Sequence, residues 1–162
     1  MPTSTGSAAM SSAGDRRSQR IVVGVDGSLT SRAALRWAVE HAHAEDVAVV
    51  THVWTASPSM VDANLCDADD DGPAQRLVEH EIAHVRALAD ALGVHLVGEV
   101  QRGDAESVLC HSEADLLVVG ACGRTRITGR LLGSVSYYLA RHCHLPLVIV
   151  PLPEGPHTTE SH

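Results

Sequence analysis

Residues 115–136 constrain the fold of this chain most, because a buried strand, a glycine-rich loop and a helix start follow one another there. Leu116–Val119 is a purely apolar run closed by Gly120, which is typical of a strand buried on both faces. A polar loop follows, and Gly133 and Ser134 close it before apolar residues recur at every fourth position. This order predicts a strand–loop–helix unit of an α/β protein.

The loop carries the residue types that hold phosphate groups. Glycines let the backbone approach a ligand closely, and a helix start presents unpaired N–H groups and a positive dipole end. Ser134 adds a hydroxyl, and Arg124, Arg126 and Arg130 add positive charge that suits phosphate oxygens. Two interpretations remain open from these residues: a phosphate cradle, or an ordinary strand-to-helix loop in which Ser134 only caps the helix.

Composition limits the chemistry and the partners. The 162 residues fit one domain, and a net charge of −8 argues against a nucleic-acid or anionic-membrane surface. The sequence has no lysine, which excludes a Walker lysine and a Schiff base. The four cysteines form no Cys-x-x-Cys pair, and no apolar leader precedes the first strand, so we expect a cytoplasmic protein without a membrane span.

Apolar and amphipathic segments alternate along the chain, which favours a parallel sheet with helices on both faces. The expected strands are residues 21–25, 47–54, 94–100, 116–119 and 147–150, and the expected helices are residues 32–44, 74–92, 105–111 and one starting near residue 134. Thr30 or Ser31 is expected to cap the first helix. We expect loose tails over residues 1–19 and 152–162, and a long mobile loop over residues 55–73.

The spacing Gly120-x2-Gly123-x9-Gly133-Ser134 resembles the ATP-binding loop of the universal stress protein family. The run Ile21–Ser28 is similar to the first strand and turn of that family, and the resemblance covers residues 20–151. It implies a single-domain, Rossmann-like sandwich of the adenine nucleotide alpha hydrolase-like type, with a five-stranded parallel sheet in the order 3-2-1-4-5. Asp26 and Gly120 would then lie side by side where the strand order reverses, the usual ligand position in such sheets.

The resemblance implies ATP and Mg²⁺ as cofactors. The residues it assigns to the nucleotide are Gly24, Asp26, Val53, Gly120, Gly123, Arg124, Arg130, Gly133, Ser134, Val135 and Ser136. Asp26 is also the candidate Mg²⁺ ligand, and the alternative is an Asx-turn that stabilises Asp26-Gly27. Val53 would lie against the adenine, with plain core packing as its alternative.

The chain departs from the family pattern at two places. Many relatives carry a small residue at the position of Arg126, so its side chain either crowds the cradle or strengthens it. Residues 103–105 (Gly-Asp-Ala) resemble the family's Gly-x-Pro turn without the proline, and the chain is shorter there than the family pattern. The second departure puts the helix over residues 105–111 in question, and the cradle is not affected.

The resemblance implies a nucleotide-gated regulatory role in stress. Because the sequence has no Walker lysine and no recognisable positioned base, we expect ATP hydrolysis to be slow at most. The alternative within the family is a nucleotide-free dimeric interaction protein. An enzyme such as a nucleotidyl transferase would need a His-x-Gly-His-like motif, which the sequence lacks. The resemblance also implies a homodimer, because the uncharged edge strand Leu147–Val150 would pair with its twin around Val148 and Val150.

Two further patterns have competing explanations. Asp67-x-Asp69-x-Asp71-Gly72 resembles half of an EF-hand loop, but Val78 stands where the twelfth-position glutamate belongs, so a solvated acidic loop is favoured. Cys122 lies inside the glycine loop, either as a small loop residue or as a redox-sensitive thiol.

Overall fold

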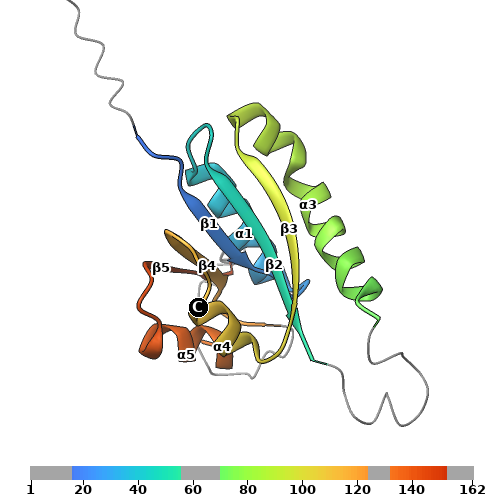
Figure 1. The fold of residues 1–162 in the computed structure, drawn as a ribbon, viewed down its shortest axis with the longest axis vertical. Coiled ribbons are helices and arrows are strands. Elements are labelled where there is room, and N and C mark those ends of the chain that lie inside the picture. The colour runs from blue at the N-terminus through green and yellow to red at the C-terminus, as the bar shows by residue number, and fades with distance from the viewer. Residues whose placement is uncertain (1–15, 56–69, 124–131, 153–162) are drawn as a thin grey trace, which may run out of the picture.

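The computed structural model describes residues 16–55, 70–123 and 132–152. Strands and helices alternate through these residues, as the apolar pattern predicts (Figure 1). In chain order they are β1 (Arg20–Gly24), α1 (Leu29–His41), β2 (Val47–Trp54), α3 (Gly72–Leu92), β3 (His95–Arg102), α4 (Ala105–Cys110), β4 (Leu116–Gly120), α5 (Ser134–His142) and β5 (Leu147–Val150). None of these helices is long and apolar enough to cross a membrane.

The strands form one five-stranded parallel sheet in the order β3-β2-β1-β4-β5, which confirms the expected fold class. The central strand β1 pairs on one side with β2, where Ile21 lies opposite Ala48. On its other side β1 pairs with β4, where Ile21 lies opposite Leu116. The strand order therefore reverses between β1 and β4, and the carboxyl ends of these two strands are neighbours.

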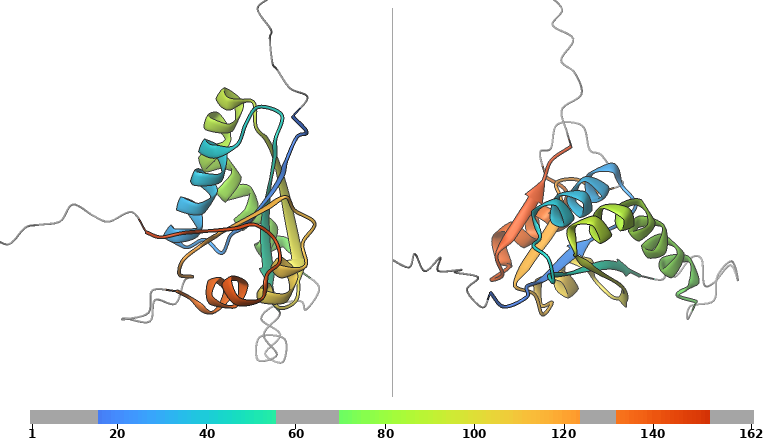
Figure 2. Two further views of the ribbon diagram at one scale, coloured as in Figure 1. Left: turned by 90° about the vertical axis from the view of Figure 1, so that its left-hand side faces the viewer. Right: turned by 90° about the horizontal axis from the view of Figure 1, so that it is seen from above.

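Two helix layers cover the sheet. α1 and α3 pack on one face, and α4 and α5 lie on the other, at the end toward which β1 and β2 run (Figure 2). Because side chains alternate along a strand, Val23 of β1 joins the core beneath α1 and α3, and Val22 joins the core beneath α4 and α5. Both side chains are at most 2% exposed, so β1 is buried on both faces.

A buried ion pair joins the two helices of the first layer. Glu81 of α3 is 1% exposed, and its two carboxylate oxygens accept hydrogen bonds from Arg32 Nε of α1 at 3.0 and 3.1 Å. A carboxylate taken this far out of water needs such a partner, because burying an unpaired charge is strongly unfavourable. The pair therefore fixes how α1 lies against α3.

The expected start of the first helix is wrong. α1 begins at Leu29, and Ser28 is its N-cap, with Ser28 Oγ accepting from the N–H of Ser31 at 3.2 Å. Thr30 and Ser31 lie inside the helix and are buried. The preceding turn explains why Ser28 is the cap. Asp26 Oδ1 accepts a hydrogen bond from the N–H of Ser28 at 3.0 Å, and this contact holds Ser28 at the start of the helix. The helix also ends at His41 rather than at residue 44.

Other element ends differ by one or two residues from the expected ones. α3 begins at Gly72, with Pro73 in its first turn, so the last two residues of the loop expected over residues 55–73 belong to this helix. β3 covers 95–102 rather than 94–100 because Arg102 is held at its end. Arg102 Nε donates to Asp71 Oδ1 at 3.1 Å, and the guanidinium lies over the ring of Trp54. α4 ends at residue 110 rather than 111.

Candidate functional site

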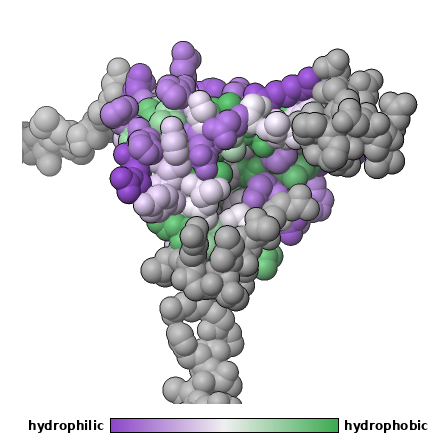
Figure 3. All heavy atoms as spheres, turned by 90° about the horizontal axis from the view of Figure 1, so that it is seen from below, coloured by the Kyte–Doolittle hydropathy of each residue, from purple (hydrophilic) through white to green (hydrophobic). Residues whose placement is uncertain are grey.

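A cavity of about 290 Å³ opens at the carboxyl ends of β1, β2 and β4, close to the lower size limit of small-ligand pockets. The end of the molecule seen from below shows apolar surface between polar patches (Figure 3). Nine of the predicted site residues line the cavity: Gly24, Asp26, Val53, Gly120, Gly123, Gly133, Ser134, Val135 and Ser136. Arg124, Arg126 and Arg130 lie outside the described residues. The fold thus brings together two parts of the chain that are far apart in sequence.

The turn after β1 presents Asp26 to the cavity. Its Oδ1 accepts from the N–H of Ser28, so the Asx-turn expected as its alternative role is present. Its Oδ2 faces Gly123, where a β-carbon would come within 2.8 Å of that oxygen. Gly27 adopts a φ of 79°, the left-handed conformation that a glycine allows at little cost. The turn therefore stabilises itself through one carboxylate oxygen of Asp26 and places the other beside Gly123 at the edge of the cavity.

Gly120 is required by packing within the protein. A β-carbon there would lie 2.6 Å from the carbonyl carbon of Thr30 and 2.8 Å from the nitrogen of Ser31. The first turn of α1 thus rests directly on the end of β4, and the Thr30 hydroxyl donates to the Cys122 carbonyl oxygen just beyond it. The same contact closes one side of the cavity.

The start of α5 forms the opposite wall. Gly133 is the N-cap in an extended conformation (φ −75°, ψ 174°), and the helix has no side-chain cap, so the interpretation of Ser134 as a capping residue is wrong. Ser136 is 2% exposed, and its hydroxyl donates to the Ala121 carbonyl oxygen at 2.7 Å. The N–H of Gly133 donates to the same carbonyl oxygen, also at 2.7 Å. Ser136 therefore ties α5 to β4, while Ser134 stays exposed at the cavity.

Three helix starts border the cavity, and they set its electrostatics. Ser28 caps α1, Ala105 begins α4 and Gly133 caps α5, and all three line the pocket. α4 has six residues and carries Asp104 and Glu106 at its start, so the positive dipole ends that favour an anion here are those of α1 and α5. Asp26 carries the only formal charge among the described residues that line the cavity.

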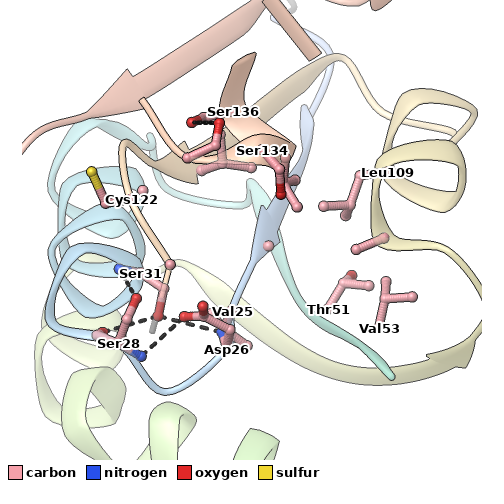
Figure 4. Close-up of a pocket in the computed structure, with 17 residues that line it drawn as sticks. Val25, Asp26, Ser28, Ser31, Thr51, Val53, Leu109, Cys122, Ser134 and Ser136 are labelled. Atoms are coloured by element: carbon pink, nitrogen blue, oxygen red, sulfur yellow. Dashed lines mark hydrogen bonds between the residues drawn. The ribbon is translucent and has the colours of Figure 1, made fainter. Parts of the chain in front are cut away.

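The cavity is polar at one end and largely apolar at the other. Figure 4 shows Asp26, Ser28 and Ser31 together near the start of α1, with Ser134 between them and the far end. At the far end, Val53 of β2 and Leu109 of α4 face the cavity. Such a site fits a ligand with an anionic part and a flat apolar part.

Several lining residues escaped prediction. Thr51 lies two positions before Val53 on β2, so strand alternation places both on one face and was a usable signal. Ser28 and Ser31 also line the pocket, and they were missed because the helix was expected to begin later than Leu29. Leu109 had no sequence signal, since only the packing of α4 on the sheet brings it to the cavity.

The region where the family proline is missing still forms a helix. The Asp104 carboxylate caps α4 by accepting from the N–H of Ser107 at 2.9 Å. A side-chain cap therefore starts the helix without the rigid φ that proline would supply. The doubt about this helix is thereby resolved, although α4 is short.

The acidic segment lies largely outside the described residues, including Asp67 and Asp69. Asp71 is described, and its carboxylate accepts from Trp54 Nε1 at 3.0 Å and from Arg102. Within 16–55, 70–123 and 132–152, no group of three or more His, Cys, Asp or Glu side chains could hold a metal ion. Asp71 therefore serves the junction of β2, β3 and α3.

The parallel sheet with a cavity at its reversal point defines a doubly wound, Rossmann-like α/β protein. Within that class, the sequence pattern described as the Universal stress protein family matches residues 17–151, and the chain belongs to this family. The family resemblance read from the glycine spacing is thus confirmed.

Relatives agree with this assignment. The chain is 33% identical over 152 residues to Universal stress protein Rv1996 of Mycobacterium tuberculosis, covering 81% of this chain and 47% of that protein. The chain spans about half the length of the curated relatives it matches. Its fold is similar to that of a universal stress protein solved in complex with cAMP (TM-score 0.62, 26% identity, 84% of this chain and 98% of that one). It is also similar in fold to a family protein from Arabidopsis thaliana with AMP bound (TM-score 0.58, 20% identity, 83% and 92%).

Proposed function

We propose that the protein binds ATP with Mg²⁺ in the cavity between β1, β4 and α5, and that nucleotide occupancy gates a regulatory interaction during stress. One observation carries the proposal: residues of the β1 turn and of the glycine spacing, far apart in the sequence, line the same cavity. The similarity to a universal stress protein in complex with cAMP supports an adenine nucleotide as the ligand class.

The two ends of the cavity suggest how the nucleotide lies. The adenine would rest between Val53 and Leu109, where flat apolar surface is buried favourably. The phosphates would lie toward the α5 start, accepting from backbone N–H groups and from the Ser134 hydroxyl. Because hydroxyls and backbone groups carry this binding, no lysine is needed.

The residues fit Mg²⁺ as a partner of the phosphates. Mg²⁺ is usually held by one or two carboxylates together with phosphate oxygens and water. Asp26 supplies a carboxylate whose Oδ2 faces the glycine loop. The ion would neutralise repulsion between that carboxylate and the phosphates. We propose binding with at most slow hydrolysis.

Replacing Gly133 with valine should weaken ATP binding by about tenfold or more, roughly 1.4 kcal/mol, while the fold survives. The fold should survive because Gly133 has a φ of −75° and the nearest atoms to an added β-carbon are 3.4 Å away. Binding should suffer because the branched side chain would stand between the helix start and the backbone of Cys122 and Gly123, which line the cavity. Calorimetry with ATP measures the effect, and mass spectrometry of nucleotide released from the purified protein identifies the ligand.

Circular dichroism and the thermal midpoint serve as the folding controls for Gly133→Val. A folded variant with unchanged ATP affinity would contradict the phosphate site. A wild-type protein that releases no nucleotide and shows no heat with ATP would instead favour the nucleotide-free interaction protein.

Asp26→Asn should weaken ATP binding about tenfold in Mg²⁺ and much less in EDTA. Asparagine keeps a side-chain oxygen that can accept from the N–H of Ser28, so the turn is preserved and only the charge is lost. Calorimetry under both conditions separates the two roles of this residue. Equal losses in Mg²⁺ and EDTA would assign Asp26 to the turn alone.

The proposed assembly is a homodimer through β5, centred near Val148 and Val150. β5 is an edge strand with four half-buried apolar residues. The carbonyl oxygens of Pro146 and Val150 accept hydrogen bonds from the N–H groups of Leu117 and Ala121 on the β4 side. Successive residues of a parallel strand point their backbone groups to opposite sides, so the N–H of Ile149 points away from β4 and toward the open edge.

Ile149→Pro should convert the dimer into a monomer. Proline has no backbone N–H, so the hydrogen bond from this position to a carbonyl oxygen of the twin strand would be lost. The matched control is Ile149→Ala, which loses similar packing but keeps the N–H. Light scattering at micromolar concentration measures both. A monomeric wild type, or a proline variant that stays dimeric, would refute the β5 interface.

A further inference from the structure

Two cysteines from different helices lie against each other beneath the second helix layer. Cys110 is the last residue of α4, and Cys143 is the C-cap of α5. The Cys143 thiol donates toward the Cys110 carbonyl oxygen, with 3.9 Å between Sγ and O. Both are free and half-buried, so neither is sealed inside the core. The fold therefore pairs two thiols that are far apart in the sequence.

The titration behaviour of Cys110 agrees with this pairing. Burial raises the pKa of the Cys110 thiol, and the charge and hydrogen bond of Cys143 raise it further. The contact between the Cys143 thiol and the Cys110 carbonyl oxygen is the geometric observation behind this pairing. Cys122, by contrast, lines the nucleotide cavity at the end of β4, and its backbone carbonyl is held by Thr30.

The thiol pair sits where it could join two separate parts of the fold. α4 precedes β4 and α5 follows it, and both helices pack on the core that contains Leu109 and Leu139. A bond between residues 110 and 143 would close a ring that contains β4 and the whole of α5. A cross-link of this kind constrains the unfolded chain more than the folded one.

We propose that Cys110 and Cys143 form a reversible intramolecular disulfide when the protein meets a hydroperoxide, and that this bond fastens α4 to α5. Because the raised pKa of Cys110 disfavours its thiolate, we assign the first step to Cys143, whose thiolate attacks the peroxide. An S–O bond forms, the O–O bond breaks, and the departing hydroxide takes up a proton to become water. In the second step the other thiolate attacks the sulfenic sulfur, so that an S–S bond forms, the S–O bond breaks and a second water leaves. Two thiols lose two electrons, and one hydrogen peroxide is reduced to two waters.

The test treats the full-length protein with hydrogen peroxide, denatures it, blocks the remaining thiols with N-ethylmaleimide and maps the disulfides by mass spectrometry. Digestion must cut after both arginine and glutamate. Cuts at Glu106 and Glu113 isolate Cys110, and cuts at Arg124 and Arg141 separate Cys122 from Cys143. We expect one linked pair of peptides, joining Cys110 to Cys143 within a monomeric chain. We also expect the thermal midpoint to rise by about 5–10 °C and to return with dithiothreitol.

Two variants act as matched controls. Cys122→Ser should leave both the link and the thermal shift in place, whereas Cys143→Ser should abolish both. The proposal is overturned if wild-type Cys110 and Cys143 remain open to N-ethylmaleimide after peroxide treatment. It is equally overturned if the link joins two chains, or if Cys122 is one of its partners.

Discussion

Replacing Arg32 with methionine should lower the free energy of unfolding by about 2–3 kcal/mol, because Glu81 would stay buried with only the His80 ring nitrogen nearby among the described residues, at 3.6 Å. Glu81 is 1% exposed and receives both of its short contacts from Arg32 Nε. Methionine keeps much of the apolar stem of arginine, so the loss reports the charge. Urea unfolding followed by circular dichroism measures it.

The double variant Arg32→Met/Glu81→Met should recover most of this loss, because an apolar pair of similar volume often replaces a buried ion pair without penalty. The matched control is Arg36→Met on the same helix. Arg36 is paired with Glu40 one turn later and is 67% exposed, so its replacement should cost only about 0.3–0.5 kcal/mol. If the two single arginine variants lose equal stability, or if the double variant recovers nothing, the buried pair does not have the assigned role.

Gly120→Ala should lower the free energy of unfolding by about 3 kcal/mol or more, the upper end of what overpacking costs. The added methyl group would meet the backbone of Thr30 and Ser31 at 2.6–2.8 Å, and backbone cannot move aside as a flexible side chain can. The first turn of α1 must then shift away from β4. Since Ser28 and Ser31 line the cavity, the site should be distorted as well.

Gly133→Ala is the matched control for Gly120→Ala. Its β-carbon has 3.4 Å to its nearest neighbours and its φ is negative, so we expect a change of less than about 1 kcal/mol in either direction. Urea unfolding compares the two glycines directly. Equal tolerance of alanine at both positions would contradict the contact between α1 and β4.

The apolar runs made the sheet predictable from sequence. Residues 21–23 and 116–119 are uniformly branched and apolar, which is typical of strands buried on both faces. The helix starts were less predictable, because Ser28, Thr30 and Ser31 all have capping side chains and a contact from Asp26 selects the first. The local sequence therefore identifies the possible N-cap residues, and the hydrogen bond with the neighbouring turn determines which of them caps the helix.

The site shows a similar division. The positions of the glycine spacing line one cavity, but the spacing assigned Gly120 to the ligand alone, whereas the structure explains Gly120 by the approach of α1. Leu109 and the pairing of Cys110 with Cys143 depend on how α4 packs, and no local pattern records that packing. Long-range packing therefore accounts for most of what the sequence left out.

The adjacency of β1 and β4 also governs when the cavity appears during synthesis. β1 can pair with β4 only after Leu116, the partner of Ile21, has left the ribosome. Until then β1 is apolar on both faces and lacks one of its two neighbours, which is a state prone to aggregation. A ligand that needs both Asp26 and the α5 start binds no shorter nascent chain, so it stabilises only the finished domain. We therefore expect chaperones, rather than nucleotide, to protect the growing chain.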